Sequence, residues 1–247
     1  MKKIFDWQMI LGLFLLILSA GAYFIQFMLF KDARNEAFYF MQDIAFLFLQ
    51  ALLAMLVINK ILNYRERQNI LKKLNMVIGA FFSETGTELL KLLSSFDKES
   101  TNIVEHLIVT NDWSKKDFYR MYKHVKAHQG SIDFENEGLK KLKNLLVSKR
   151  DFLLRLLENP NLMEHETFTD LLWAVFHLTE ELEQRKGLEN LGGKDKEHLK
   201  NDIKRAYILM ISQWLSYMEH LKKDYPYLFS LALRTSPFDK NATAEVK

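Results

Sequence analysis

The sequence predicts an all-α protein, with an N-terminal two-span transmembrane helical hairpin followed by a cytosolic bundle of about six or seven helices. Two apolar stretches of membrane-spanning length fill the first part of the chain, and charged residues with helically spaced apolar residues fill the rest. Only 3 Pro and 9 Gly occur among 247 residues, which favours long helices. The chain lacks the alternating pattern and tight-turn dipeptides that are typical of paired strands.

The first predicted span runs from Gln8 to Phe30 and carries no formally charged residue. A helix of this length crosses a hydrocarbon layer of about 30 Å with some tilt. The basic start and the small residues from Ser19 to Ala22 also fit a cleavable signal peptide, but the apolar stretch continues well beyond them. We therefore expect a membrane span here.

The second predicted span runs from Ala37 to Ile58 and carries a single charge, Asp43. The connection over residues 31–36 holds two cations and two anions, whereas Lys2 and Lys3 precede the first span. Five cations follow the second span and are expected to contact lipid head groups: Lys60, Arg65, Arg67, Lys72 and Lys73. The positive-inside rule then places both termini of this multi-pass protein in the cytoplasm, at the cell (plasma or inner) membrane.

Polar residues recur every seven positions in both spans, a spacing of two helical turns that places them on one helix face. They are Gly12, Ser19 and Gln26 in the first span, and Glu36, Asp43 and Gln50 along the second. With a six-residue connection, Gln26 is expected near the level of Asp43. Three interpretations stay open: the stripes bond to each other within one hairpin, they join subunits of a homo-oligomer, or several hairpins surround a cation path with Asp43 on its wall.

The second span is expected to continue as a helical stalk over residues 59–78, because no Gly or Pro occurs between Ala37 and Ile78. A cytosolic helical domain follows over residues 79–238, and residues 239–247 form a disordered tail. The predicted helices of the domain occupy about residues 78–96, 103–109, 114–128, 137–158, 161–187, 195–224 and 227–234.

Start and stop signals support these bounds. Ser114 and Asp117 form a capping-box pattern at the start of the third helix. Pro160 ends the fourth helix, Gly187 ends the fifth, and Pro226 separates the last two. The bundle of roughly 165 residues is large enough to bury a core of its own.

Acidic and His side chains gather on two successive predicted helices and are candidate metal ligands. They are Glu166, Asp170, His177 and Glu181 on the first helix, and His198 and Asp202 on the second. Antiparallel packing would bring carboxylates and imidazoles together, as in the metal sites of helical bundles. Neither a pair of Glu-x-x-His motifs nor a His-Glu-x-x-His signature is present. The alternative is a solvated acidic face with ion pairs to Lys200, Lys204 and Arg205.

Composition excludes several other classes of protein. The 34 Lys and Arg against 31 Asp and Glu leave a net charge of only +3, so we expect no nucleic-acid partner. The absence of Cys excludes disulfides, thiolate metal sites and a cysteine nucleophile. No phosphate loop, kinase signature or dinucleotide-binding fingerprint occurs, and the sequence identifies neither a cofactor nor a catalytic residue.

Two segments carry a resemblance to known sequences. LENPNLMEHETFTDLLWAVFHLTEEL, from Leu157 to Leu182, and YPYLFSLALRTSPF, from Tyr225 to Phe238, are similar to segments of prokaryotic hypothetical membrane proteins. Those proteins have a short N-terminal hairpin and a cytosolic helical part, and the resemblance covers most of the chain. It implies the membrane setting and assigns no functional residue.

Three functions follow as hypotheses. The first is a homo-oligomeric, channel-like, ion-conducting membrane protein with a cytosolic gating or assembly domain, because two polar stripes exceed the needs of an anchor. The alternative is a membrane-anchored scaffold or regulatory protein whose helical domain binds a cytosolic protein. The second alternative is a membrane-tethered metal-dependent enzyme that uses the candidate metal ligands.

Overall fold

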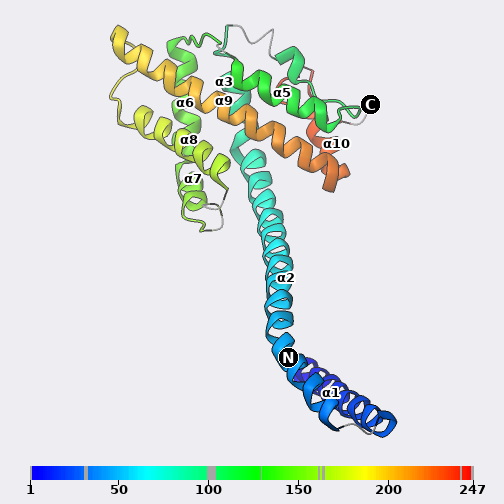
Figure 1. The fold of residues 1–247 in the computed structure, drawn as a ribbon. Coiled ribbons are helices and arrows are strands. Elements are labelled where there is room, and N and C mark those ends of the chain that lie inside the picture. Colours follow the sequence, from blue (N-terminus) through cyan, green and yellow to red (C-terminus); the bar gives the residue numbers. More distant parts are fainter. Residues whose placement is uncertain are drawn as a thin grey trace. The chain divides into compact units, whose positions relative to one another are not determined.

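The computed structural model describes residues 2–30, 33–98, 104–128, 130–160, 162, 165–239 and 241–245. These residues form an all-α protein, as predicted (Figure 1). Among them, the strand-like pairing is limited to an isolated bridge between Asp97 and Ile132. The chain divides into two compact units, Met1–Arg67 and Gln68–Lys247.

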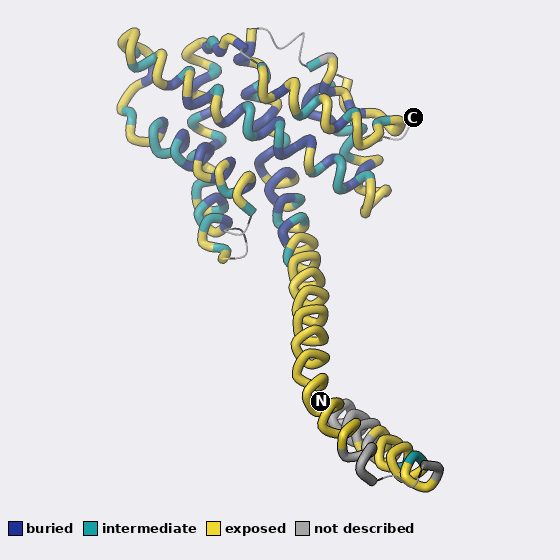
Figure 2. Tube along the Cα trace, viewed as in Figure 1, coloured by how far each residue is buried: buried dark blue, intermediate teal, exposed yellow. Residues whose placement is uncertain are grey.

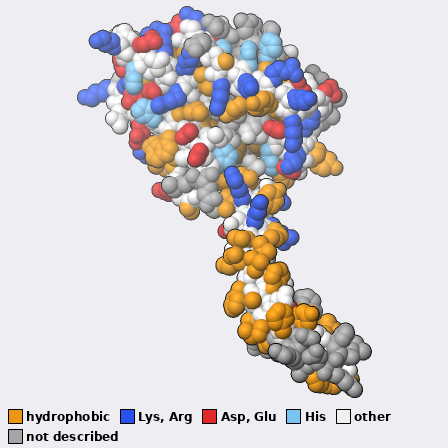
Figure 3. All heavy atoms as spheres, viewed as in Figure 1, with side chains coloured by type: hydrophobic (Ala, Val, Ile, Leu, Met, Phe, Trp, Pro, Cys, Tyr) orange, Lys and Arg blue, Asp and Glu red, His pale blue; other side chains and the backbone are white. Residues whose placement is uncertain are grey.

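The first unit contains α1 (Lys2–Phe30) and the N-terminal part of α2 (Ala33–Phe81). Within the described residues, the one helical stretch long and apolar enough to cross a membrane is Phe38–Ser94, and none of its apolar window is buried. α1 contributes a shorter apolar stretch, Leu13–Met28. Figure 2 shows that the described part of α2 in this unit is exposed, and Figure 3 shows hydrophobic side chains along it. Both predicted apolar segments are helical, while their insertion as two spans stays a prediction.

Fewer residues separate α1 from α2 than in the predicted polar connection over residues 31–36. α2 already begins at Ala33, so four of those six residues belong to the helix. The earlier start of α2 changes which residues of the two helices lie at the same level, because each helical residue rises by about 1.5 Å. The residue of α1 that reaches Asp43 is therefore Tyr23, which lies nearly one turn before Gln26.

α2 continues through Gly79 and ends at Phe81, so this glycine does not interrupt the helix. The predicted stalk over residues 59–78 lies inside α2. A π-helical turn, η1 (Phe82–Gly86), connects α2 to α3 (Thr87–Ser94). The aromatic rings of Phe81 and Phe82 are buried at this junction.

The second unit is built around one long helix, α9. α9 spans Gly193–Asp224. After the end of α2, η1 and α3, the other described helices of this unit are η2 (Glu105–Leu107), α5 (Lys115–Ala127), α6 (Asn136–Ser148), α7 (Arg150–Leu157), α8 (Glu166–Gln184) and α10 (Pro226–Arg234). α9 packs against α3, α5, α8 and α10, and α8 also covers α6 and α7. Because α9 has neighbours on several sides, residues from most of its faces are buried, including Ile203, Tyr207 and Met210.

For two helices of this unit, the predicted bounds are wrong. The helix expected over residues 137–158 is two helices, α6 and α7, with a break at Lys149, whose φ is −103° and ψ is 5°. In the described part of residues 103–109, the helix shrinks to the 3-10 turn η2. The capping box of Ser114 and Asp117 is confirmed at the start of α5, and Pro226 is confirmed at the first turn of α10.

Candidate functional site

Two histidines and an aspartate converge where α8 lies against α9. The Nε2 atom of His177 on α8 is 3.4 Å from Oδ2 of Asp202 on α9. The Nε2 atom of His198, one turn before Asp202 on α9, is 3.3 Å from the same oxygen. Each residue offers one ligand atom, and the three atoms lie within 4.8 Å of one another. We call these three residues the His-His-Asp cluster.

The antiparallel register of α8 and α9 brings this cluster together. Three contacts follow one another along the helix pair: His177 with Asp202, Glu181 with His198, and Arg185 with Asp195. From one contact to the next, the first partner lies four residues later along α8, ending with Arg185 directly after this helix. The second partner lies three to four residues earlier on α9, as antiparallel helices require. The start of α8 is fixed by His165, whose Nδ1 accepts a hydrogen bond of 3.2 Å from the Phe168 N–H.

Asp202 has a buried carboxyl group, and only one of its two oxygens accepts a hydrogen bond. The residue is 7% exposed, and its Oδ1 accepts a hydrogen bond of 3.3 Å from Arg205 Nη2. Its Oδ2, which faces the two imidazoles, is buried and makes no hydrogen bond. Because a buried polar atom without a partner costs free energy, this oxygen is the least satisfied part of the cluster.

An ion-pair network borders the cluster. Arg185 donates to Oδ1 of Asp195 over 2.7 Å and to Oε2 of Glu181 over 2.5 Å. The hydrogen bonds from Arg185 lower the pKa of both carboxyl groups below their usual range. Glu181 Oε2 also lies 3.9 Å from His198 Nε2. Glu181 is therefore ionised beside the cluster, with its charge directed mainly to Arg185.

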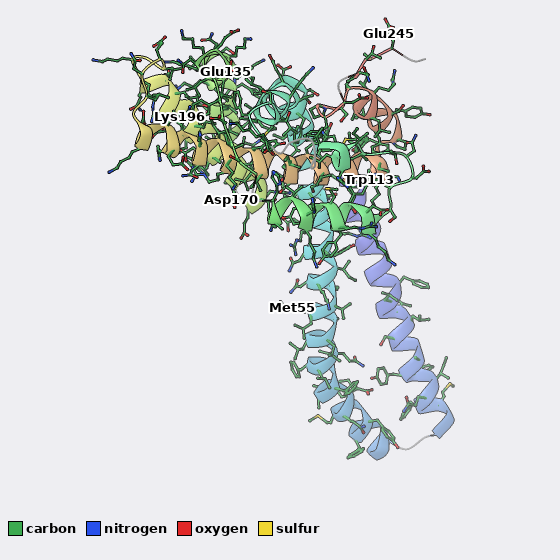
Figure 4. All side chains as sticks on the ribbon, turned by 90° about the horizontal axis from the view of Figure 1, so that it is seen from above. Met55, Trp113, Glu135, Asp170, Lys196 and Glu245 are labelled. Carbon is green, nitrogen blue, oxygen red and sulfur yellow. The ribbon has the colours of Figure 1, made fainter. Side chains whose placement is uncertain are left out.

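The six predicted metal ligands thus separate into two groups. His177, His198 and Asp202 meet, with Glu181 at their edge. Asp170, labelled in Figure 4, is exposed more than one turn before His177. Glu166 is exposed as the first residue of α8.

The predicted ion pairs of this face are found in part. Arg205 pairs with Asp202, as expected. Lys200 instead contacts Asp133, in the loop before α6, over 3.1 Å. The part played by Arg185 was missed, because only the register of the two helices places this residue between Glu181 and Asp195.

A groove runs beside the cluster between α5, α8 and α9. One part has a volume of about 650 Å³ and a second part about 730 Å³, and both are lined by Asp170, Ile208 and Leu209. The first part reaches Lys115, Tyr119 and Lys126 on α5, and the second reaches Trp173, His177 and Arg205. The groove was not predicted, because its walls come from helices far apart in the sequence.

In the first unit, Asp43 of the second predicted polar stripe bonds to Tyr23, which belongs to neither stripe. The Tyr23 hydroxyl donates a hydrogen bond of 2.9 Å to Oδ2 of Asp43, and the Tyr23 ring meets Phe40 edge to face. The side chains of Ser19 and Gln50 are exposed, and that of Gln26 is half-buried. The side chain of Glu36 lies outside the part of the chain whose side chains are described.

The five cations predicted to contact lipid head groups all lie on α2. Lys60, Arg65, Arg67, Lys72 and Lys73 are exposed. Exposure is what contact with lipid head groups requires, and that contact stays a prediction.

The chain matches two families of helical domains. Residues 70–234 match the C-terminal helical domain of the uncharacterized protein MJ1433, and residues 2–62 match the N-terminal helical domain of MJ1433. The chain is 46% identical to the protein "Uncharacterized protein MJ1433" of Methanocaldococcus jannaschii over 236 residues, which cover 96% of this chain and 95% of that protein. No solved structure matches the chain.

Proposed function

The chain belongs to the MJ1433 family of helical proteins, and we propose that it serves as a membrane-anchored scaffold or regulatory protein. In this proposal the N-terminal hairpin crosses the membrane twice and only holds the protein there. The second unit stays on the cytoplasmic side and binds another protein in the groove between α5, α8 and α9. The positive-inside distribution of cations supports this orientation.

The observation that carries the proposal is the hydrogen bond between Tyr23 and Asp43. A carboxyl group inside a bilayer is costly unless a partner satisfies it. Here the partner comes from the other helix of the same hairpin, so the polar group joins α1 to α2 without help from a neighbouring subunit. An anchor needs no more than this internal bond and an apolar surface.

The apolar surface of α2 supports the membrane setting. Large hydrophobic side chains such as Phe48, Leu52 and Leu56 are each more than half exposed. A contiguous apolar surface of this length is unfavourable in water, at roughly 25 cal/mol for each Å². Lipid chains would cover it in the proposed two-span topology.

The groove supports the binding of a protein helix. Its floor is apolar, with Phe118, Ile208 and Leu209, and Tyr119 at its rim is 61% exposed. Lys115 and Lys126 flank it on α5. An amphipathic helix would place its apolar face on this floor and acidic residues against the two lysines.

Site-specific photocrosslinking in living cells tests the proposal. A photoreactive amino acid in place of Tyr119 should crosslink one cytosolic protein, and the substitution Leu209→Glu should abolish that crosslink. The matched control replaces Tyr227 on α10, which is 93% exposed and lies outside the groove, and should give no such product. Crosslinks to a second copy of this chain, or none at all, would count against the proposal.

A homo-oligomeric, channel-like protein is the second candidate function. The observation that favours it is the exposure of Ser19, Asp43 and Gln50, which leaves both polar stripes accessible to neighbouring hairpins. Several hairpins could then assemble with Asp43 facing a water-filled path, which would favour cations. Ion flux through liposomes that contain the purified protein distinguishes this channel from an anchor.

A further inference from the structure

We propose that the His-His-Asp cluster, His177, His198 and Asp202, binds one divalent first-row transition metal ion such as Zn²⁺. The site would join α8 to α9 inside the second unit. It goes beyond the proposed scaffold function, since neither the anchor nor the apolar floor of the groove needs a metal ion, although His177 also lines the groove. It also stands whether or not a protein partner binds.

The donor set selects the class of metal. Imidazole nitrogen is a preferred ligand of zinc, iron, nickel and copper, whereas calcium and magnesium take mainly oxygen ligands. Two imidazoles with one carboxylate therefore favour a first-row transition metal over the hard cations. Soft thiolate sites are excluded because the chain has no Cys.

The distances fit a shared metal better than direct ion pairs. Charge-assisted hydrogen bonds between N–H donors and carboxylates are about 2.7–2.9 Å long. The two Nε2 atoms lie 3.3 and 3.4 Å from Oδ2 of Asp202. Ligands bound at about 2.0–2.1 Å around a tetrahedral zinc ion lie about 3.3 Å from one another, which matches these two distances to Oδ2. All three ligand atoms lie within 4.8 Å of one another, so a small movement of the imidazoles would complete the spacing.

The unpartnered oxygen is an independent indication. Asp202 is more than nine-tenths buried, and its Oδ2 points between the imidazoles without a hydrogen bond. Arg205 already engages the other oxygen, Oδ1. A metal ion at Oδ2 would supply the missing partner, and the half-exposed side chains of His177 and His198 have room to adjust around it.

Three protein ligands leave at least one coordination position for water or a small molecule. Metal sites with three protein ligands and an open position are typical of catalytic centres, whereas structural zinc sites have four protein ligands. Access to the site exists, because His177 lines the groove on one side and a pocket of about 590 Å³ with Glu181 and Asp195 on the other. The cluster therefore has the arrangement of an open site.

Metal binding to the full-length protein in detergent, freed of any affinity tag, tests the inference. Equilibrium dialysis against Zn²⁺ should give one tight equivalent, and Co²⁺ should give visible absorption bands typical of tetrahedral nitrogen and oxygen ligation. The substitutions His177→Ala, His198→Ala and Asp202→Asn should each weaken binding by about tenfold or more, since even outer-shell changes cost about 10–100-fold at such sites. Mg²⁺ in excess should not displace the bound Zn²⁺.

The matched control is His220→Ala on the same helix. His220 pairs with Asp224 at 3.0 Å, outside the cluster, so its removal should leave the affinity for Zn²⁺ unchanged. Far-UV circular dichroism checks that each variant keeps its helices. If Asp202→Asn does not fold, the two His variants decide, because both side chains are about half exposed. Zn²⁺ binding that is absent, or equal in wild type and both His variants, would overturn the site.

Discussion

Tyr207 buries its hydroxyl group in the middle of α9, where the oxygen has no hydrogen-bond partner. The residue is 1% exposed, and burial, with the nearby charge of Asp97 as a smaller cause, raises the pKa of its hydroxyl. Removing an unsatisfied buried hydroxyl leaves the packing of the ring intact. We expect Tyr207→Phe to leave the free energy of unfolding unchanged or to raise it by up to about 1 kcal/mol.

Denaturant unfolding of the full-length protein in detergent, followed by circular dichroism, measures this effect. Thr179→Val is the matched control, because the Thr179 hydroxyl is equally buried but donates to the Val175 carbonyl over 2.8 Å. That variant should lose about 0.5–1.5 kcal/mol. A loss in Tyr207→Phe as large as in Thr179→Val would show that the Tyr207 hydroxyl does have a partner.

Asp133 makes a pH-dependent contribution to stability. Its carboxylate lies 2.5 Å from Lys98 Nζ and 3.1 Å from Lys200 Nζ, and the hydrogen bonds from these lysines lower its pKa far below the usual range. Since the folded pKa is lower than the unfolded pKa of about 3.9, the contribution is present at neutral pH. It declines as the pH falls below the unfolded pKa toward the folded pKa.

Asp133→Asn should therefore lower the melting temperature at pH 7, and the difference from wild type should shrink below about pH 4. Thermal scans from pH 7 to pH 3 provide the measurement. Glu166→Gln, which removes an exposed carboxylate at the start of α8, should change the melting temperature little at any of these pH values. A difference for Asp133→Asn that stays constant with pH would contradict the proposed electrostatic origin.

At the scale of elements, the π-helical turn η1 depends on a glycine. A Cβ atom on Gly86 would lie 2.8 Å from the Phe82 ring and 2.9 Å from the Phe81 ring, and both rings are buried. Gly86→Ala should lower the free energy of unfolding by about 1–3 kcal/mol, because the packed rings must move. Denaturant unfolding with circular dichroism detection measures the change.

Gly79 provides the comparison for this prediction. It lies inside α2, and a Cβ atom there would meet only the Tyr217 side chain, at 3.3 Å from its hydroxyl. Because Ala is favoured over Gly in a helix by up to about 1 kcal/mol, Gly79→Ala should be neutral or stabilising. Equal losses of unfolding free energy in Gly86→Ala and Gly79→Ala would contradict this prediction. They would mean that the effect comes from backbone freedom and not from the space beside Phe81 and Phe82.

The sequence predicts where a helix starts or ends when the residues that cause it are neighbours in the chain. The start of α5 was predictable because Ser114 and Asp117 cap it from three residues apart. The break at Lys149 was not, because neither Gly nor Pro marks it and the apolar spacing continues across it. α6 and α7 both pack against α8, a tertiary arrangement that local spacing does not contain.

The same distinction holds for the candidate site. Helical spacing alone placed His198 and Asp202 on one face of α9, and antiparallel pairing made a contact with His177 foreseeable. The contact of Tyr23 with Asp43 was not foreseen, because α2 begins at Ala33, four residues earlier than the predicted second span.

At the scale of the whole molecule, the two units present different kinds of surface. The first unit exposes apolar side chains along α2, whereas the second buries its apolar residues around α9. The two units also match separate family domains, residues 2–62 and 70–234. This division fits the proposal that the first unit anchors the protein and the second binds a partner.

Ion flux through the purified protein in liposomes separates the anchor from the channel. If the hairpin only anchors the protein, Asp43 serves its bond to Tyr23, and wild type, Asp43→Asn and Tyr23→Phe should all show no more flux than protein-free liposomes. We expect this result. If Asp43 lines a path, wild type should pass cations in preference to anions, and Asp43→Asn should reduce that flux. Proteolysis of the second unit on intact liposomes checks that the protein is inserted. A cation flux that Asp43→Asn reduces would favour the channel over the anchor.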